Sequence, residues 1–267
     1  MRSPGAEGGP SQACFLVPEL AATSVGGRLD VEGDEGRHAV SVRRVRLGET
    51  VSLTDGRGSL AEGRVVECRP PNRMRVEIDQ IRFDPRVVPW IEVGLSVLKG
   101  DRMARAIEQL TEAGVEGITP VIADRSVARW QPGRESGEIG RLRRRAAEAA
   151  KQSRRAWLPE VRLPATLTDL TEDRASRLLV VLAEDGPAAG DAWWRDRLVD
   201  RIEPIAEVLV LVGPEGGFSP SEVRALRTAG AHPLALGPGV MRSGTAALAG
   251  VVAVSMMSGR WQTGDRD

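Results

Sequence analysis

The chain has 267 residues, 41% hydrophobic and 28% charged, with equal numbers of basic and acidic side chains and no net charge. This composition is typical of a globular protein long enough for two domains. No apolar run is long enough to cross a bilayer, and the N-terminus lacks the apolar core of a secretory signal, so we expect neither a membrane protein nor an exported one. Cys14 and Cys68 lie far apart with no CxxC pair and no histidine cluster, which predicts no disulfide, no metal site and a reducing cytoplasm.

The positive charge is unevenly distributed along the chain. Lys99 and Lys151 are its only lysines, and the arginines concentrate within 37–46 and 141–155. Local clusters of this kind matter more for phosphate binding than the net charge does. Each cluster taken alone is equally compatible with a solvated helix face.

Residues 1–13 are rich in Gly and Pro, which predicts a disordered leader. From 14 to 84 the pattern predicts short strands, with Asp55-Gly56-Arg57-Gly58 as a hairpin turn. The expected strands are 14–17, 28–31, 50–53, 59–67 and 74–81. One helix, capped by Asp34 and continuing through Val45, interrupts them. The pattern of this segment predicts a small barrel or sandwich, followed by a Pro-punctuated linker at 85–89.

From residue 90 to 262 the pattern changes to apolar strands that alternate with helices. The strands are expected at 91–97, 117–122, 178–182, 208–212 and 234–236. The helices are expected at 101–113, 138–155 and 246–257. Short apolar strands of this kind are buried on both faces, which predicts an α/β domain with a parallel sheet and helices on both sides.

Two glycine-rich loops follow consecutive strands of this domain. The first is Gly213-Pro214-Glu215-Gly216-Gly217, after which Ser219, Pro220 and Glu222 form a strong helix start. It is neither a Walker A loop nor a GxGxxG fingerprint. The second loop runs from Leu236 into an apolar helix rich in small residues. Because ligands bind beyond the carboxyl ends of parallel strands, the two loops together predict one backbone-lined pocket, with a simple tight turn as the alternative for either loop alone.

At these loops the sequence resembles a known family. Leu211-Val212-Gly213-Pro214-Glu215-Gly216-Gly217, paired with Leu236-Gly237-Pro238 and Met241-Arg242-Ser243-Gly244-Thr245-Ala246, is similar to the 16S ribosomal RNA uracil-N3 methyltransferases of the SPOUT superfamily. Further motifs agree in the same order, including Leu98-Lys99-Gly100-Asp101-Arg102-Met103 and, near the N-terminus, Arg37-His38-Ala39-Val40. The resemblance extends over about residues 14–260.

The resemblance implies a trefoil-knotted α/β domain, a PUA-like N-terminal β-barrel and S-adenosylmethionine as cofactor. The implied reaction is methylation of uridine N3 in the RNA of the small ribosomal subunit, with Arg242 and Glu215 as catalytic residues. Arg242 stays protonated and would stabilise negative charge on the uracil, while Glu215 would orient Arg242, accept a proton or bond the loop amides. The residues expected to bind the cofactor are Leu182, Gly213, Pro214, Gly216, Gly217, Leu236, Gly237, Met241, Ser243 and Thr245.

Seven basic residues are expected to contact ribosomal RNA. They are Arg43, Arg44, Arg46, Lys99, Arg102, Arg125 and Arg154. The first three are expected on the N-terminal helix, and the apolar helix 246–257 is expected at a homodimer interface. In one departure, Gly244 stands where many family members carry Glu. Two alternatives remain open: ribose 2′-O methylation, which the PUA-like match disfavours, and a catalytically inactive RNA-binding assembly factor.

Overall fold

The computed structural model describes residues 13–128, 130, 133–172, 177–194 and 206–261. The predicted leader therefore lies outside the described residues except for Ala13. The chain forms two compact units, one of residues 1–86 with 150–158 and the other of residues 87–149 with 159–267. Nothing in the sequence pattern indicated that a short segment after the middle of the chain returns to the N-terminal unit.

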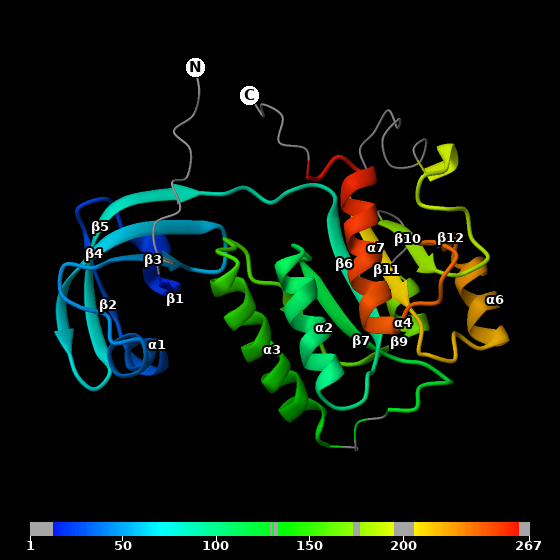
Figure 1. Ribbon diagram of the computed structural model, residues 1–267, viewed down its shortest axis with the longest axis horizontal. Coiled ribbons are helices and arrows are strands. Elements are labelled where there is room, and N and C mark those ends of the chain that lie inside the picture. The colour runs from blue at the N-terminus through cyan, green and yellow to red at the C-terminus, as the bar shows by residue number, and fades with distance from the viewer. Residues whose placement is uncertain (1–12, 129, 131–132, 173–176, 195–205, 262–267) are drawn as a thin grey trace. The chain divides into compact units, whose positions relative to one another are not determined.

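The N-terminal unit is a five-stranded sheet in the order β1-β3-β4-β5-β2 (Figure 1). The strands are β1 (Cys14–Leu16), β2 (Arg28–Val31), β3 (Thr50–Thr54), β4 (Ser59–Arg69) and β5 (Arg73–Phe83). β1 runs parallel to β3, the other pairs are antiparallel, and two register shifts interrupt the ladder between β4 and β5. Alternate side chains form one core around Phe15, Leu53 and Met74. The predicted β domain is confirmed strand by strand.

Glycines in the turn between β3 and β4 allow residues 156–158 to pack closely against it. Gly58 donates a backbone hydrogen bond to Ala156 at 2.9 Å, and Leu158 donates one to Gly56 at 3.0 Å. A Cβ atom at Gly56 would lie 2.7 Å from the Leu158 side chain, and one at Gly58 would lie 2.7 Å from the Trp157 ring. Both glycines also have positive φ, so the turn needs them for its conformation and for this approach.

The predicted N-terminal helix is shorter than expected. α1 (Gly33–Arg37) continues only as a π-helical turn at 38–42, and the residue before it, Glu32, makes no side-chain cap. The prediction that Asp34 caps the helix is therefore wrong. So is the helical placement of the arginines, because Arg43 ends the turn and Arg44 has a φ of 55°. Arg43, Arg44 and Arg46 lie on the exposed segment that follows.

The second unit contains a parallel sheet in the order β12-β10-β11-β6-β7-β8, with β9 also paired to β7. Its long strands are β6 (Trp90–Ser96), β7 (Gly117–Ile122), β10 (Arg177–Leu182) and β11 (Glu207–Val212). The short ones are β8 (Glu160–Val161), β9 (Ala165–Thr166) and β12 (His232–Leu234). Every pairing is parallel.

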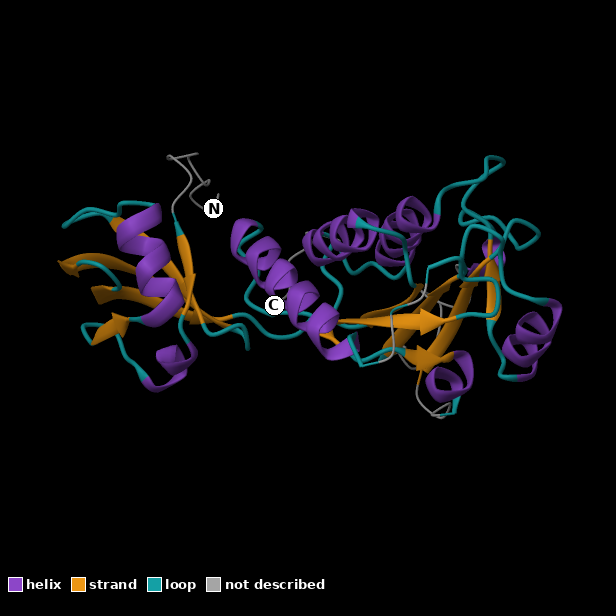
Figure 2. Cartoon of the chain, turned by 90° about the horizontal axis from the view of Figure 1, so that it is seen from below, coloured by secondary structure: helices purple, strands orange, loops and turns teal. Residues whose placement is uncertain are grey.

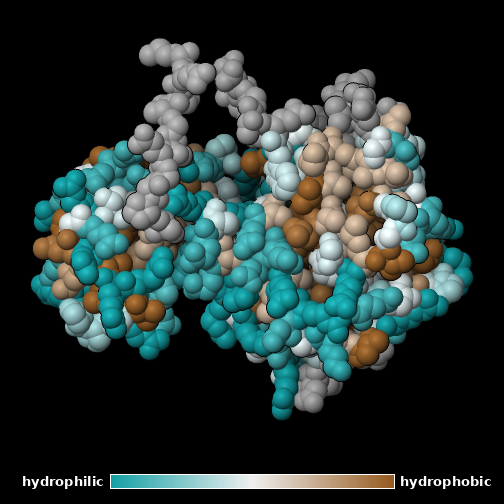
Figure 3. Space-filling model, viewed as in Figure 1, coloured by the Kyte–Doolittle hydropathy of each residue, from teal (hydrophilic) through white to brown (hydrophobic). Residues whose placement is uncertain are grey.

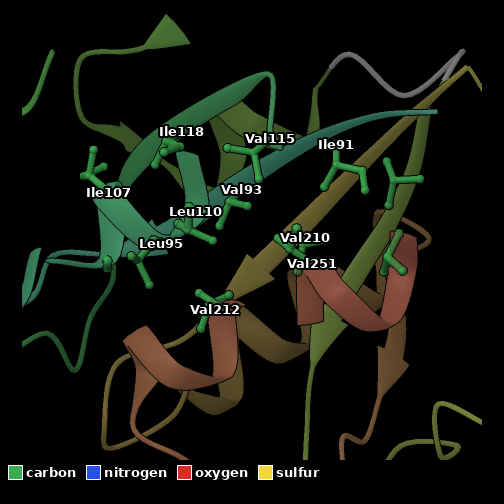
Figure 4. Packing of buried hydrophobic residues seen from close by; sticks show 14 of the residues in the cluster. Ile91, Val93, Leu95, Ile107, Leu110, Val115, Ile118, Val210, Val212 and Val251 are labelled. Carbon is green, nitrogen blue, oxygen red and sulfur yellow. The ribbon is translucent and has the colours of Figure 1, made fainter. Parts of the chain in front are cut away.

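Helices cover both faces of this sheet (Figures 1 and 2). On one face, α2 (Asp101–Glu112), α3 (Glu135–Gln152) and α7 (Ser243–Met257) pack on the side chains that Figure 4 shows together, such as Val93, Leu95 and Val210. On the other face, α4 (Leu167–Thr171) and α6 (Pro220–Thr228) pack on Leu209 and Leu211. Successive strand residues thus point to opposite buried faces, which explains their continuous apolar sequence. The predicted α/β class is confirmed.

Several element boundaries differ from the sequence prediction. β12 spans His232–Leu234 where 234–236 was expected, and two helices are shifted as well. α7 begins at Ser243 rather than Ala246, because Arg242 is its N-cap residue and accepts a backbone hydrogen bond from Ala246. α3 ends at Gln152 rather than continuing to residue 155, and Arg154 has a φ of 53°. Both shifts are at helix ends, where local sequence specifies structure least.

Buried and partly buried ion pairs lie at the amino ends of the parallel strands. The Glu92 carboxylate on β6 contacts Arg162 at 2.6 Å and Arg177 on β10 at 3.5 Å. The hydrogen bond from Arg162 to Glu92 raises the pKa of the Arg162 guanidinium above its ordinary value. Nearby in the same unit, buried Arg260 pairs with Glu116, which accepts a 2.8 Å hydrogen bond from the Ile91 amide.

Candidate functional site

A pocket of about 500 Å³ lies at the carboxyl ends of β10, β11 and β12. Its wall is made by the loops that follow these three strands, together with residues of α6 and the start of α7. The position agrees with the expectation from the two glycine-rich loops. The pocket therefore lies where parallel α/β sheets bind ligands.

Most of the predicted cofactor residues line this pocket. They are Leu182, Gly213, Pro214, Gly217, Leu236, Gly237, Met241 and Ser243. Gly216 and Thr245 are outside the lining: Gly216 faces Arg125, and Thr245 is an exposed residue in the first turn of α7. The catalytic role of Glu215 stays a prediction, but its side chain belongs to the lining as well.

The first loop has little room for a side chain at Gly213. A Cβ atom there would lie 3.3 Å from both the ring and the backbone nitrogen of Phe218, which lines the pocket. In the second loop Gly237 has a φ of 153°, a conformation that other residues rarely adopt. A side chain would thus be crowded in the first loop, and the backbone conformation favours glycine in the second.

Three polar contacts hold the first loop in place. Arg102, in the first turn of α2, forms an ion pair with the Glu215 carboxylate. Arg125, in the segment after β7, donates hydrogen bonds to the carbonyl oxygens of Gly216 at 3.1 Å and Phe218 at 3.5 Å. Both arginines were expected to contact RNA, and in the structure their side chains contact the loop. Orienting Arg242 was one of three tasks considered for Glu215, and its observed partner is Arg102.

The helix after this loop begins as the sequence predicts. Ser219 and Glu222 form a reciprocal capping box with Pro220 in the first turn. The Ser219 hydroxyl also donates a 2.7 Å hydrogen bond to Asp124, and the Asp124 amide donates one of 2.8 Å to Glu222. The cap of α6 is thereby tied to the same segment after β7 that carries Arg125.

Arg242 lies at the junction between the second loop and α7. Its side chain is exposed, and its neighbours Met241 and Ser243 both line the pocket. Gly244 follows in the first turn of α7, where a Cβ atom would make ordinary contacts of 3.5 Å with Leu98 and 3.7 Å with Ala106. This position has room for a side chain, so its glycine is not a requirement of the packing.

Charged residues that the sequence pattern did not single out also belong to the lining. Glu184 and Asp185 follow β10, and Arg227 comes from α6. With Glu215 the lining has three carboxylates and one guanidinium, so its formal charge is negative. The sequence could have indicated Glu184 and Asp185 as pocket residues, because they directly follow an apolar strand. The carboxyl ends of neighbouring parallel strands lie at the same edge of the sheet.

The remaining predicted RNA-binding residues are exposed. Arg43, Arg44, Arg46 and Arg154 all belong to the N-terminal compact unit, and Lys99 follows β6 in the other one. Over the ranges that the structure describes, no three His, Cys, Asp or Glu side chains gather as a metal site would require. The helices in those ranges are all too short or too polar to cross a membrane.

Comparisons with known proteins agree with this architecture. A family described as an RNA methyltransferase domain matches residues 86–256, and one described as an RNA methyltransferase PUA domain matches residues 31–78. Ribosomal RNA small subunit methyltransferase E of Mycobacterium bovis is 36% identical over 256 residues, covering 94% of this chain and 93% of the relative.

Solved structures give the same result. The ribosomal RNA small subunit methyltransferase E from Neisseria gonorrhoeae, bound to S-adenosyl methionine, aligns with a TM-score of 0.80 and 26% identity, covering 92% of this chain and 98% of that one. A putative methyltransferase from Legionella pneumophila in complex with the same cofactor aligns with a TM-score of 0.78 and 25% identity, covering 92% and 97% of the two chains. The sequence match, extending over nearly the whole length, shows that this chain belongs to the ribosomal RNA small subunit methyltransferase E family.

Proposed function

We propose that this protein transfers the methyl group of S-adenosylmethionine to N3 of a uridine in 16S ribosomal RNA. The observation that carries the proposal is the pocket enclosed by the two glycine-rich loops, with Arg242 at its edge. A backbone-lined pocket at the carboxyl edge of a parallel sheet suits a nucleoside-type ligand. Family membership supports the same reaction class.

The residues of the pocket fit the cofactor in shape and in charge. Leu182, Leu234 and Leu236 offer apolar surface for a flat base, and the backbone of the glycine loops offers hydrogen bonds to its edge. Glu215 is paired with Arg102, and the carboxylates of Glu184 and Asp185 still outnumber the Arg227 guanidinium, which favours a ligand with a positive centre. The bound cofactor would supply an electrophilic methyl group on a sulfonium.

The residues around the pocket have distinct tasks in this proposal. Uracil N3 carries a proton that must leave before or during attack, and the three lining carboxylates are the available acceptors. Arg242 stays protonated, so its task is to stabilise negative charge on the uracil oxygens. Glu215 and Arg102 hold the cofactor loop by their ion pair. Alignment of the two reactants supplies much of the remaining acceleration.

In this proposal both units of the chain contribute to binding of the RNA substrate. N3 lies on the Watson–Crick edge, so the target uridine must be unpaired or flipped out of its helix. The four arginines of the N-terminal unit that the sequence predicts to bind RNA would contact phosphates and position the RNA without reading its sequence. The proposal places the protein in the cytoplasm, where the small ribosomal subunit is assembled and used.

The proposal includes a homodimer built on α7. This helix is apolar around its whole circumference, and only part of it is covered by α2, β6 and β11. Figure 3 shows hydrophobic residues along the side of α7 that faces the viewer. Small residues such as Ala249 and Ala253 are only partly buried, which would let a second copy approach closely.

The first test identifies the methylated atom. Unmodified 16S RNA and assembled small subunits are incubated with the protein and isotopically labelled S-adenosylmethionine, then digested to nucleosides and analysed by mass spectrometry. We expect labelled 3-methyluridine. A 2′-O-methyl nucleoside would instead support the ribose methyltransferase alternative. Cofactor binding without any transfer would support an inactive assembly factor.

A second prediction concerns the cofactor loops. Gly213→Val and Gly237→Val should each weaken S-adenosylmethionine binding at least about tenfold, because the first crowds Phe218 and the second forces an unfavourable φ. Calorimetry on the full chain measures this affinity. Gly190→Val is the matched control, since a Cβ atom at exposed Gly190 would have no atom within 4 Å. Unchanged affinity in both loop variants contradicts the assignment.

A third prediction separates RNA binding from catalysis. Replacing Arg43 and Arg46 together by Ala should weaken RNA binding and lower the slope of log Kd against log salt by about 1.4, at ~0.7 for each phosphate lost on a single strand. Arg242→Ala should reduce kcat while RNA affinity is retained. Arg82→Ala, an exposed arginine of β5, is the control. If the Arg43/Arg46 double variant binds RNA like the wild type and Arg242→Ala abolishes RNA binding, the two roles are reversed.

A fourth prediction concerns the dimer. Light scattering at micromolar concentration should give about twice the chain mass of 28.7 kDa. Ala253→Glu should shift the protein toward the monomer, because it places a charge on the partly exposed face of α7. The same substitution at exposed Ala225 on α6 should leave the mass unchanged. A monomeric wild-type protein rules out this interface.

A further inference from the structure

A second hollow lies between α2 and α3, on the surface of the methyltransferase unit. It has a volume of about 530 Å³ and is lined chiefly by arginines. Its charged residues are Arg105, Arg141, Arg144, Arg145, Asp101 and Glu148. Figure 3 shows hydrophilic residues over these two helices. We call this hollow the α2–α3 groove.

Two of its arginines have carboxylate partners and two lack them. Arg145 pairs with Glu108 at 2.6 Å, and Arg141 pairs with Glu138 at 2.8 Å. Arg105 and Arg144 are exposed, and neither forms an ion pair within the described ranges of the chain. The groove therefore presents two guanidinium groups that form no ion pair with a carboxylate of the described chain.

The groove is connected to the pocket through α2. Arg102 in the first turn of this helix pairs with Glu215, which lines the pocket. Arg105 follows three residues later on a neighbouring position of the helix surface, about 4.5 Å further along the axis at ~1.5 Å per residue. A chain whose base enters the pocket beside Glu215 can thus reach the groove within one helical turn.

We infer that the α2–α3 groove binds the phosphate backbone of the RNA strand that flanks the target uridine. The inference rests on the proposed function and adds a contact site on the catalytic unit to the arginines of the N-terminal unit. A guanidinium group can donate two parallel hydrogen bonds to the oxygens of one phosphate. For an exposed arginine without an ion pair, these bonds replace the hydration that is lost on binding. Extruding a base rotates its nucleotide about the backbone and costs stacking energy, so a phosphate-binding site one helical turn from the pocket would hold the flanking strand in the extruded conformation.

An acidic peptide is the other ligand that such a groove could take. The carboxylates of Asp101 and Glu148 in the groove act alike on an acidic peptide and on a phosphate backbone, so charge alone does not select between these two ligands. Its connection to the pocket that receives the substrate base favours RNA. The RNA backbone is therefore the occupant that we propose.

The test uses the full chain and an unmodified 16S RNA fragment. Arg105→Gln and Arg144→Gln are made singly and together, and the double control is Arg82→Gln with Arg224→Gln, two exposed arginines outside the groove. The double groove variant should raise the KM for RNA about tenfold and lower the slope of log Kd against log salt by about 1.4. S-adenosylmethionine affinity and the unfolding temperature should stay at wild-type values. The control pair should retain the wild-type KM and slope.

The outcomes separate this inference from the proposed function. Wild-type protein that transfers no methyl group to any RNA overturns the proposed function. Wild-type transfer, together with a groove variant whose KM and salt slope equal those of the wild type, overturns the groove as an RNA site. The RNA assignment is also wrong if the variant leaves RNA binding unchanged but loses binding to a poly-glutamate peptide. A lower kcat with unchanged RNA affinity likewise overturns it, because a backbone contact acts on binding.

Discussion

The site depends on the contacts that fix the loop after β11, because one backbone hydrogen bond, from Gly217 to Pro214, is the loop's own contribution among the described interactions. Three of its five residues, 213–217, are glycines, which lose more conformational freedom on ordering than any other residue. Arg102 binds its one carboxylate, Arg125 binds two carbonyl oxygens at its end, and Ser219 is tied to Asp124 beyond it. A pocket lined by backbone has a defined shape only when such contacts fix the backbone. The start of α2 and the segment after β7 are thus part of the site without lining it.

Ion pairs at the amino ends of the strands fix the register in which the carboxyl ends meet at the pocket. Glu92 on β6 contacts Arg162 and Arg177. Arg260 contacts Glu116, which precedes β7 and accepts a hydrogen bond from the Ile91 amide of β6. Removing one partner of a buried pair leaves an uncompensated charge, so a slip of one strand past another is strongly disfavoured. With the amino ends fixed, the loops after β10, β11 and β12 emerge at one edge. Ionic contacts and the ligand pocket therefore occupy opposite ends of the same strands.

The features that the sequence predicts well are those set by neighbouring residues. The buried strands follow from continuous apolar runs, and the start of α6 follows from Ser219, Pro220 and Glu222, three signals within four residues. The features it misses depend on residues far apart in the chain. Arg102 and Glu215 are separated by 113 positions, and no local pattern pairs them. The return of residues 150–158 to the N-terminal unit is hidden in the same way, since its partners, such as Gly56 and Gly58, lie far earlier in the chain.

The zero net charge of the chain is compatible with RNA binding because acidic residues neutralise particular arginines and leave others unpaired. In the N-terminal sheet Asp30 accepts hydrogen bonds from Arg75 and Arg73, which lower the pKa of its carboxyl to about 2. In the catalytic unit Glu92 and Glu116 neutralise arginines at the amino ends of the strands. An arginine held in a buried pair is not available to a phosphate, whereas exposed Arg105 and Arg144 are. The pattern of ion pairs, and not the total charge, therefore determines where a polyanion can bind.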